Sequence, residues 1–399
     1  MNYNPRIISV PNQERARQEL LNIGCDTAGR NIMSAKAVFK VIRVEQVKSK
    51  AALILKQTFL AKGGEVSVTR GAADLSSEYT DVMISATLKQ YRLAIQQLKA
   101  QPWGLSQLSD DLAAVLAADE TFPARQYEWP RHRLTIEPKK TLVMGILNLT
   151  PDSFSDGGRF NSFDAALRHA EAMIAAGADI IDIGAESTRP YGSETISAAE
   201  EMERLLPVLE KVLAVSSVPV SVDTYKASVA EAALKLGVHM INDIWGLQKD
   251  PDMAAVVARY KVPVCIMHNQ DGTEYAKDIM AEICGFLRRS MEIGTAAGIE
   301  SKYFIVDPGI GFGKVPTDNL VVMARMEELR SLGCPVLLGT SRKRFIGEAL
   351  QLPPEQRVEG TGATVALGIT KGAHIVRVHD VEPIVRICKM MDAMKCCQA

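Results

Sequence analysis

The sequence predicts an α/β protein in which a small N-terminal α/β domain precedes a (β/α)8, or TIM, barrel. The prediction depends on chain length, on eight strand-like apolar runs after residue 141, and on polar residues that end each run. A chain of 399 residues exceeds what one hydrophobic core usually serves, so two domains are expected. We place the N-terminal domain and its linker at residues 1–138 and the barrel at residues 139–399.

The N-terminal domain alternates strand and helix patterns. Gly63 and Gly64 end the first long helix pattern, Pro102 and Gly104 end the last, and a proline-containing linker follows. The sequence of this domain contains no phosphate loop, metal-ligand cluster or nucleophile arrangement, so its function stays open. The expected elements are a helical lead-in over residues 1 to about 30, strands over 37–44, 65–69 and 81–86, and helices over 45–61 and 88–99.

The barrel prediction comes from counting. The span of residues 141–399 matches the roughly 250 residues typical of a (β/α)8 barrel, and each apolar run is followed by a helix-length segment. A parallel barrel brings the carboxyl ends of all its strands to one rim, where enzymes of this fold have their active sites. The runs cover residues 142–149, 179–184, 218–222, 239–241, 262–267, 303–306, 336–338 and 375–378.

Composition excludes several classes of function. The 46 basic and 47 acidic residues give a net charge of -1, so no attraction to nucleic acid or to an anionic membrane is expected. No apolar run approaches the roughly 18 residues of a membrane span, and the N-terminus lacks the apolar core of a signal peptide. The seven cysteines are dispersed and odd in number, which predicts reduced thiols in a cytoplasmic protein.

Seven segments then identify a family. They are MGILNLTPDSFSDGG (144–158), GADIIDIGAESTRP (177–190), SVDT (221–224), INDI (241–244), DPGIGFGK (307–314), GTSRK (339–343) and IVRVHD (375–380). In this order they resemble dihydropteroate synthase of the folate pathway, over residues 141 to about 390. The resemblance implies a transferase, and a sulfonamide target, that condenses 6-hydroxymethyl-7,8-dihydropterin pyrophosphate with 4-aminobenzoate to give 7,8-dihydropteroate and pyrophosphate.

The resemblance assigns the pterin to five residues. A carboxylate accepts the ring N–H and the exocyclic amine of a pterin side by side, and an amide both donates and accepts hydrogen bonds. A lysine reaches the pterin carbonyl in this family, and Lys343 matches it. The expected pterin-binding residues are Asp223, Asn242, Asp307, Lys343 and Arg377.

Taken by themselves, some of these residues have simpler interpretations. Asp223 could cap a helix that starts near Tyr225, and Asp307 could be a turn residue before Pro308. The residues do not settle whether Asn242 or Asp243 points inward, although the family match favours Asn242.

The resemblance also assigns the pyrophosphate and a magnesium ion. Arg377 lies inside an apolar strand, where its charge is costly unless it meets an anion, and His379 lies two residues further on the same face. Asn148 matches the family's magnesium contact, and a hard cation needs few protein ligands when phosphates supply the rest. The expected pyrophosphate-binding residues are Asn148, Thr188, Arg189, Arg377 and His379.

The remaining assignments concern 4-aminobenzoate and the chemistry. Ser341 is expected to bind the carboxylate of 4-aminobenzoate, and Phe154, Pro190 and Phe312 to form apolar walls, although both phenylalanines could equally be core residues. Asp156, Lys343 and Arg377 are the expected catalytic residues. Two glycine-flanked loops, 152–158 and 185–192, resemble the family's lids, which exclude water from a reactive intermediate.

Two rival functions remain at this point. A corrinoid-dependent methyltransferase on a related barrel would share the pterin carboxylates but would need neither the pyrophosphate loop nor the Ser341–Lys343 run. A non-catalytic pterin-binding protein would be expected to have lost at least one rim residue, and none is lost here. The resemblance further implies a homodimer formed through the last barrel helices.

Overall fold

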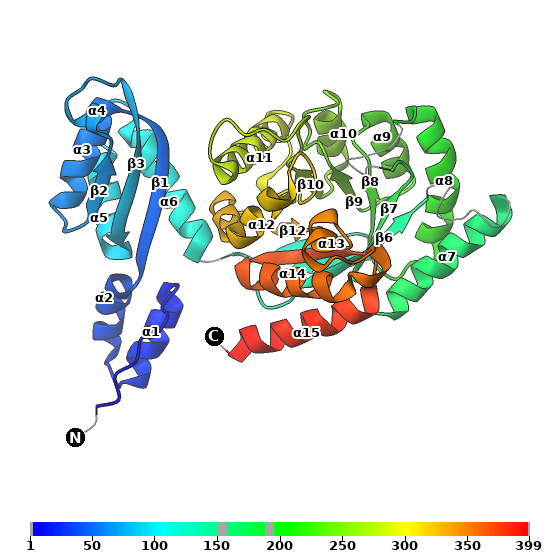
Figure 1. Ribbon diagram of the computed structural model, residues 1–399, viewed down its shortest axis with the longest axis horizontal. Coiled ribbons are helices and arrows are strands. Elements are labelled where there is room, and N and C mark those ends of the chain that lie inside the picture. Colours follow the sequence, from blue (N-terminus) through cyan, green and yellow to red (C-terminus); the bar gives the residue numbers. More distant parts are fainter. Residues whose placement is uncertain (1–2, 121, 150–158, 188–194, 398–399) are drawn as a thin grey trace. The chain divides into compact units, whose positions relative to one another are not determined.

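A computed structural model describes residues 3–120, 122–149, 159–187 and 195–397 (Figure 1). The chain forms two compact units, residues 1–121 and 122–398. The division therefore comes before the expected boundary at residue 138, and most of the proline-containing linker belongs to the second unit. Each unit has its own hydrophobic core.

The first unit contains an antiparallel sheet with strand order β1-β3-β2. Val82, Ile84 and Ala86 of β3 are buried on the face that the helices cover, in one cluster with Leu55 and Tyr91. The elements are α1 (Gln13–Asn22), α2 (Thr27–Ala37), β1 (Phe39–Lys48), α3 (Ser49–Leu60), β2 (Glu65–Val68), α4 (Arg70–Ala73), β3 (Tyr79–Thr87), α5 (Leu88–Leu98) and α6 (Leu105–Glu120).

The three predicted strands and the helix over 88–99 are found in this unit, but three other elements differ from expectation, and the first is the short helix α4, where a loop was expected. The helix expected from residue 45 begins only at Ser49, because β1 continues through a bulge between Val44 and Val47 in which Gln46 has a positive φ of 55°. Helix α6 was not predicted. It buries Leu105, Leu112 and Leu116 in the core of the unit.

The second unit is a closed barrel of eight parallel strands in the order β6-β7-β8-β9-β10-β11-β12-β13, so the predicted TIM barrel is confirmed. Its strands are β6 (Leu142–Asn148), β7 (Ile180–Gly184), β8 (Val220–Asp223), β9 (Met240–Asp243), β10 (Val264–Met267), β11 (Phe304–Asp307), β12 (Val336–Leu338) and β13 (Ala373–Val378). The α-helices are α7 (Arg159–Ala175), α8 (Ala198–Val215), α9 (Ala227–Lys235), α10 (Met253–Tyr260), α11 (Ile279–Ala296), α12 (Pro316–Ala324), α13 (Arg344–Leu350), α14 (Val358–Lys371) and α15 (Val381–Cys397). Short 3-10 helices are η2 (Ser301–Tyr303), η3 (Met326–Leu332) and η4 (Pro354–Gln356).

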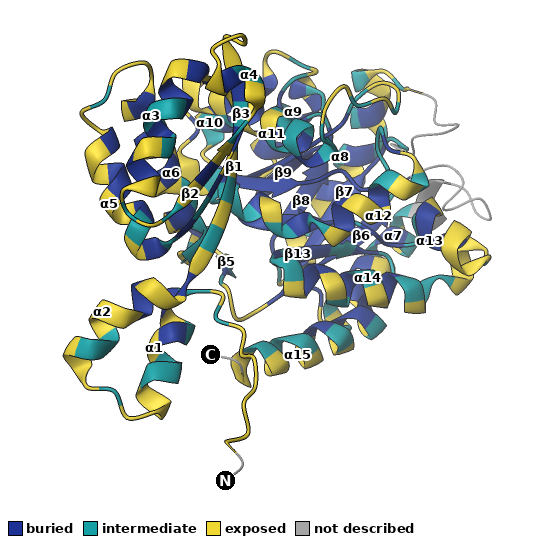
Figure 2. Cartoon of the chain, turned by 60° about the vertical axis from the view of Figure 1, so that its left-hand side comes forward, coloured by how far each residue is buried: buried dark blue, intermediate teal, exposed yellow. Residues whose placement is uncertain are grey.

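Strand alternation separates two layers of side chains in the barrel. Successive residues of a strand point to opposite faces, so Val376 and Val378 pack outward against the helices while Arg377 between them points inward. The lower interior is apolar and includes Met144, Ile180 and Met240. The buried strands lie behind helices that are exposed on their outer faces (Figure 2).

An unpredicted hairpin, β4 (Arg125–Glu128) with β5 (Arg133–Ile136), belongs to this apolar interior cluster. Its buried residues Tyr127, Leu134 and Ile136 join Leu142 and Met144 of β6 in one cluster. The hydroxyl of Tyr127 donates to the Lys302 carbonyl. The hairpin therefore supplies part of the core below the polar rim.

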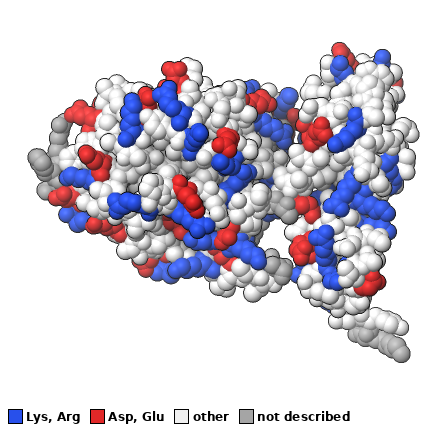
Figure 3. Space-filling model, turned by 180° about the vertical axis from the view of Figure 1, so that it is seen from behind, with Lys and Arg blue, Asp and Glu red and all other residues white. Residues whose placement is uncertain are grey.

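The surface agrees with the balanced composition. Basic and acidic side chains intermingle on the face of the molecule in Figure 3. Among the described residues, no helix is both long enough and apolar enough to span a bilayer. The seven cysteines, all within the described residues, are not joined by disulfide bonds.

Shortening Ile136 to alanine tests the role of the hairpin. Ile136 is fully buried, so Ile136→Ala should lower the free energy of unfolding by about 2–5 kcal/mol through lost contacts and a residual cavity. Urea denaturation followed by circular dichroism measures this change. The matched control is Arg133→Ala on the exposed side of the same strand, expected within about 0.5 kcal/mol of the wild type. Equal stability of the two variants would contradict a core role for the hairpin.

Candidate active site

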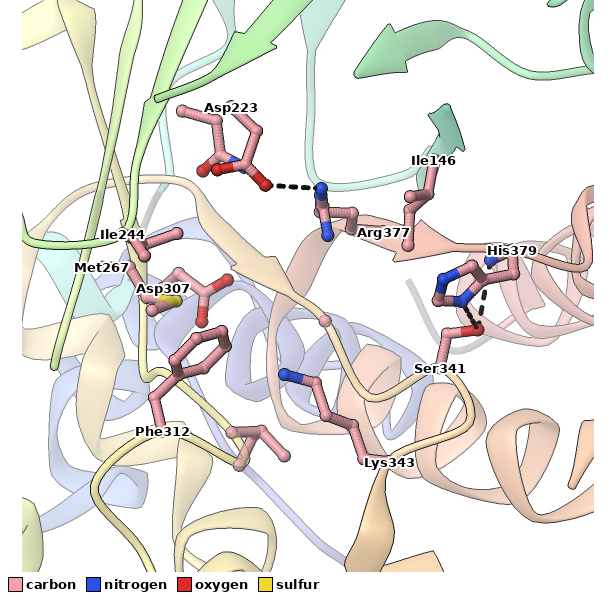
Figure 4. A pocket seen from close by; sticks show the side chains of 13 residues that line it. Ile146, Asp223, Ile244, Met267, Asp307, Phe312, Ser341, Lys343, Arg377 and His379 are labelled. Atoms are coloured by element: carbon pink, nitrogen blue, oxygen red, sulfur yellow. Dashed lines mark hydrogen bonds and ion pairs between the residues drawn. The ribbon is translucent and has the colours of Figure 1, made fainter. Parts of the chain in front are cut away.

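A cavity opens at the carboxyl ends of the barrel strands (Figure 4). It holds about 460 Å³ of empty space, some of it open to solvent, and combines apolar walls with charged and polar groups. This combination is typical of a small-molecule site. The lining residues are Ile146, Asp223, Asn242, Ile244, Met267, Asp307, Ile310, Phe312, Gly339, Ser341, Lys343, Arg377 and His379.

Arg377 is the centre of a buried network of charges. Its Nε donates to Asp182 Oδ2 at 2.6 Å and its Nη2 donates to Asp223 Oδ2 at 2.7 Å. Asn242 Nδ2 donates to the same oxygen of Asp182 at 3.1 Å. Arg377 thus meets two carboxylates inside the protein, which offsets the cost of burying its charge.

Asp182 was missed by the sequence analysis, although a signal was present. It is a charged residue in the middle of the apolar run 179–184, the same feature that singled out Arg377. Strand alternation places it inward, between the outward Ile181 and Ile183. The side chain of Asp182 is fully buried.

Asp223 does not cap a helix. Helix α9 begins at Ala227, and its N-cap residue Lys226 makes no side-chain cap. Burial raises the pKa of Asp223, Arg377 opposes the rise, and the neighbouring Asp182 carboxylate adds to it.

Three buried polar atoms near this network, Asp182 Oδ1, Asp223 Oδ1 and Ser221 Oγ, have no hydrogen-bond partner within the described part of the chain. Buried polar atoms are normally paired. Of the three residues, Asp223 lines the cavity, so its free oxygen favours a polar ligand there.

Asp307 and Lys343 face the cavity from two neighbouring strand ends. Asp307 Oδ1 accepts the backbone N–H of Gly309 at 2.7 Å, so this carboxylate also has the turn role considered above. The ammonium of Lys343 lies 4.1 Å from the ring centroid of Phe312. Burial raises the pKa of Asp307 to about 6 and lowers that of Lys343 to about 8, and the two groups oppose each other's shift. At pH 7 both charged forms predominate.

Ser341 and His379 form a hydrogen-bonded pair that also lines the cavity. Ser341 Oγ lies 3.0 Å from His379 Nδ1 and accepts the backbone N–H of His379 at 3.1 Å. Burial and the nearby Arg377 lower the pKa of His379 to about 4. His379 therefore offers a neutral imidazole at pH 7.

The other predicted residues are less closely tied to this cavity. Asn242 lines it, whereas Asp243 accepts the backbone N–H groups of Trp245 and Leu247. Asn148 is half-buried at the end of β6 and is not among the lining residues. Five predicted residues lie outside the described part of the chain: Phe154, Asp156, Thr188, Arg189 and Pro190.

The described residues near the cavity offer few ligands for a metal ion. Within the described ranges, no group of three or more His, Cys, Asp or Glu side chains could hold a metal ion. Asn148 offers one amide oxygen at the rim.

Comparison with known proteins now adds to this geometry. Residues 144–379 match the model of a family described as pterin binding enzyme. Dihydropteroate synthase of Bacillus subtilis is 58% identical over 256 residues, which are 64% of this chain and 89% of that protein. The chain belongs to the dihydropteroate synthase family. The family match covers every described residue that lines the cavity.

Solved structures of the family agree with the fold. A crystal structure of dihydropteroate synthase from Clostridium difficile, in the presence of pteroic acid, is 52% identical with a TM-score of 0.63, and covers 64% of this chain and 97% of that one. The enzyme from Xanthomonas albilineans with 4-aminobenzoic acid is 40% identical with a TM-score of 0.65, and covers 68% of this chain and 99% of that one.

One further relative extends beyond the barrel. A probable bifunctional folylpolyglutamate synthase/dihydropteroate synthase of Halobacterium salinarum is 38% identical over 369 residues. The match covers 91% of this chain and 44% of that protein, so it reaches into the N-terminal unit.

Removing the cation of the buried network tests how that network contributes to stability. Arg377→Met leaves Asp182 and Asp223 as buried carboxylates without their ion pair and should lower the free energy of unfolding by about 3–5 kcal/mol at pH 8. The pKa of Asp223 then rises further, and a raised carboxyl pKa loses stability as pH rises, so the deficit should be smaller at pH 5.5. Urea denaturation at both pH values measures this.

The control for this variant is Arg386→Met, which removes an exposed i,i+4 ion pair with Glu382. It should remain within about 1 kcal/mol of the wild type at either pH. A deficit in Arg377→Met that does not change with pH would contradict this account of the network.

Proposed function

We propose that the barrel unit condenses 6-hydroxymethyl-7,8-dihydropterin pyrophosphate with 4-aminobenzoate to form 7,8-dihydropteroate and pyrophosphate. One observation carries the proposal: a carboxylate, Asp307, and an ammonium, Lys343, face one cavity beside Phe312, with Asn242 and Arg377 on the adjoining wall. This is a donor and acceptor set suited to the edge of a flat heterocycle.

The pterin would be bound as follows. Asp307 accepts the ring N–H and the exocyclic amine, and Lys343 donates to the ring carbonyl. Asn242 and Asp223 meet the remaining polar atoms of the ring, with Arg377 holding Asp223 in place through its ion pair. The apolar side chains of Ile244 and Met267 contact the faces of the ring system.

The reaction breaks the bond between the pterin methylene and the pyrophosphate oxygen, and the bonding electron pair leaves with pyrophosphate. Guanidinium donors of Arg377 not used for carboxylates, the neutral imidazole of His379, and Thr188 and Arg189 bind the leaving group. Asp156 stabilises the positive charge on the methylene. The aminobenzoate nitrogen, already neutral at pH 7, forms the new C–N bond and releases one proton.

The second substrate would lie toward Ser341. We assign its carboxylate to Ser341 and the neighbouring backbone, and its ring to Phe154, Pro190 and Phe312. Of these residues, Ser341 and Phe312 line the described cavity.

We further propose that Mg²⁺ assists the reaction, with Asn148 as its protein ligand. When bound, the ion would neutralise charge on the departing pyrophosphate. The protein's own contribution is to present the Asn148 oxygen at the end of β6 beside the rim.

A cytoplasmic homodimer is the expected working form. Exposed Leu367 on α14 and exposed Met390 and Met394 on α15 are consistent with an interface formed by the last barrel helices. The function of the N-terminal unit stays open.

Substituting the two charged groups tests the proposal. Asp307→Asn and Lys343→Met should each lower kcat/KM for the pterin substrate by about 10–100-fold, since each removes a charged hydrogen bond to the pterin. Pyrophosphate release in the presence of both substrates measures this change. Near-wild-type turnover in both variants would overturn the pocket assignment.

The raised pKa of Asp307 predicts that pterin affinity depends on pH. Because the pKa of Asp307 is raised to about 6, wild-type affinity for the pterin should fall as pH decreases through 6, where the carboxylate becomes protonated. Asp307→Asn should lack this step in calorimetric titrations between pH 5 and 8. A wild-type affinity that does not change over this range would exclude Asp307 as the pterin carboxylate.

Chelation tests the metal. EDTA should lower turnover severalfold, and added Mg²⁺ should restore it. Asn148→Ala should need more Mg²⁺ for half-maximal rate, because one oxygen ligand is lost. Assays over a range of Mg²⁺ concentrations measure this. A rate that EDTA does not change would refute the magnesium assignment.

A further inference from the structure

A further buried cation, Lys314, lies in the segment that joins β11 to α12, directly after the glycine-containing loop 309–313. Lys314 is 4% exposed, although it belongs to none of the groups assigned to substrates. Its Nζ lies 2.9 Å from His268 Nδ1 and donates to the carbonyls of Gly309 and Phe312, both at 3.0 Å. An ammonium has three hydrogens, and these three acceptors use all of them.

The surroundings of His268 favour its role as the acceptor of this hydrogen bond. Its ring stacks beside Tyr275 at 6.1 Å and meets the edge of Phe286 at 5.0 Å between centroids. Burial, together with the charge of Lys314, lowers the pKa of His268 to about 2, so the imidazole is neutral. With Nδ1 accepting from Lys314, the imidazole proton lies on Nε2.

The loop above Lys314 has a backbone that depends on glycine. Gly309, Gly311 and Gly313 have φ values of 68°, 85° and 55°. A Cβ on Gly309 would lie 1.9 Å from the carbonyl oxygen of His268. This path turns the carbonyls of Gly309 and Phe312 toward the interior, where each needs a donor in place of water.

The same loop holds two of the groups that face the cavity. The N–H of Gly309 donates to Asp307, and Phe312 places its ring beneath the ammonium of Lys343. One side of the loop is therefore bonded to Lys314 and the other side is in contact with the pterin groups. A displacement of the loop would move both groups.

We infer that Lys314 is a positioning residue whose ammonium, oriented by His268, holds the 309–313 loop so that Asp307 and Lys343 face the pterin, with the ring of Phe312 held against Lys343. The inference rests on the proposed function, because it concerns the same cavity. Lys314 itself does not line the cavity, so it is not expected to contact either substrate.

The surroundings of Lys314 act on the pKa of its ammonium in both directions. Burial lowers the pKa of Lys314 to about 7, Asp307 and Asp318 oppose this shift, and Lys343 adds to it. A buried cation is costly unless it is well bonded. Its three hydrogen bonds compensate for that cost in the loop.

The test compares four variants of the full-length protein. Lys314→Met keeps the length of the side chain without its charge. His268→Asn keeps an acceptor near the position of Nδ1, whereas His268→Leu removes it. Lys235→Met, on the exposed side of α9, is the matched control. Calorimetry with the dihydropterin pyrophosphate alone, in the absence of 4-aminobenzoate, measures pterin binding.

We expect Lys314→Met and His268→Leu to weaken pterin binding about tenfold or more, the size of a lost charged hydrogen bond. His268→Asn should stay within about threefold, and Lys235→Met should match the wild type. Thermal unfolding of each variant shows whether weaker binding comes from an unfolded protein or from a folded protein in which the loop is displaced. If Lys314→Met does not fold, the comparison of His268→Asn with His268→Leu decides.

Two results would overturn the inference. One is wild-type pterin affinity in a folded Lys314→Met variant. The other is equal affinity in His268→Asn and His268→Leu. A wild-type protein that forms no dihydropteroate would instead refute the proposed function, so the two failures can be told apart.

Discussion

The active-site end of the barrel depends on the ion pairs that compensate for the buried charge of Arg377. Arg377 lies inside a parallel barrel whose lower layer is apolar, and such a charge is tolerated only where partners replace water. Asp182 and Asp223 supply two carboxylates from neighbouring strands, and Asn242 ties a third strand to the same oxygen of Asp182. The network ties together side chains from four strands and leaves one oxygen of Asp223, which lines the cavity, without a partner in the described part of the chain.

The site consists of an apolar layer inside the barrel and a polar layer at its rim. Apolar residues of the hairpin and the lower strands form a packed interior, so polar groups are confined to the rim above it. Around that rim, opposite charges on Asp307 and Lys343 remain in their ionised forms near pH 7 because each opposes the effect of burial on the other. Beneath them, Lys314 and His268 hold the glycine loop from the side away from the cavity.

Several features could not be read from local sequence. The hairpin β4–β5 lies in a stretch with three prolines, and the sequence analysis therefore interpreted this stretch as a linker. The two strands are short and are stabilised by packing against the barrel, which no local pattern shows. Strand β1 continues past residue 45 because it pairs with β3 through a bulge, whereas helical spacing of the following apolar residues favoured an earlier helix. Lys314 and His268 are far apart in the chain, and only the closed barrel brings them to 2.9 Å.

The sequence by itself determined the eight barrel strands, the polar residues that end each strand, and the family. Apolar periodicity and the residues at strand ends are local properties, so they can be recognised without knowledge of the fold. The sequence also singled out Arg377, since a charge inside an apolar strand requires a partner. The tertiary structure alone decided which partners those are. Asp182 meets Arg377 across 195 residues of chain, and such a contact depends on barrel closure and strand register, which no local pattern specifies.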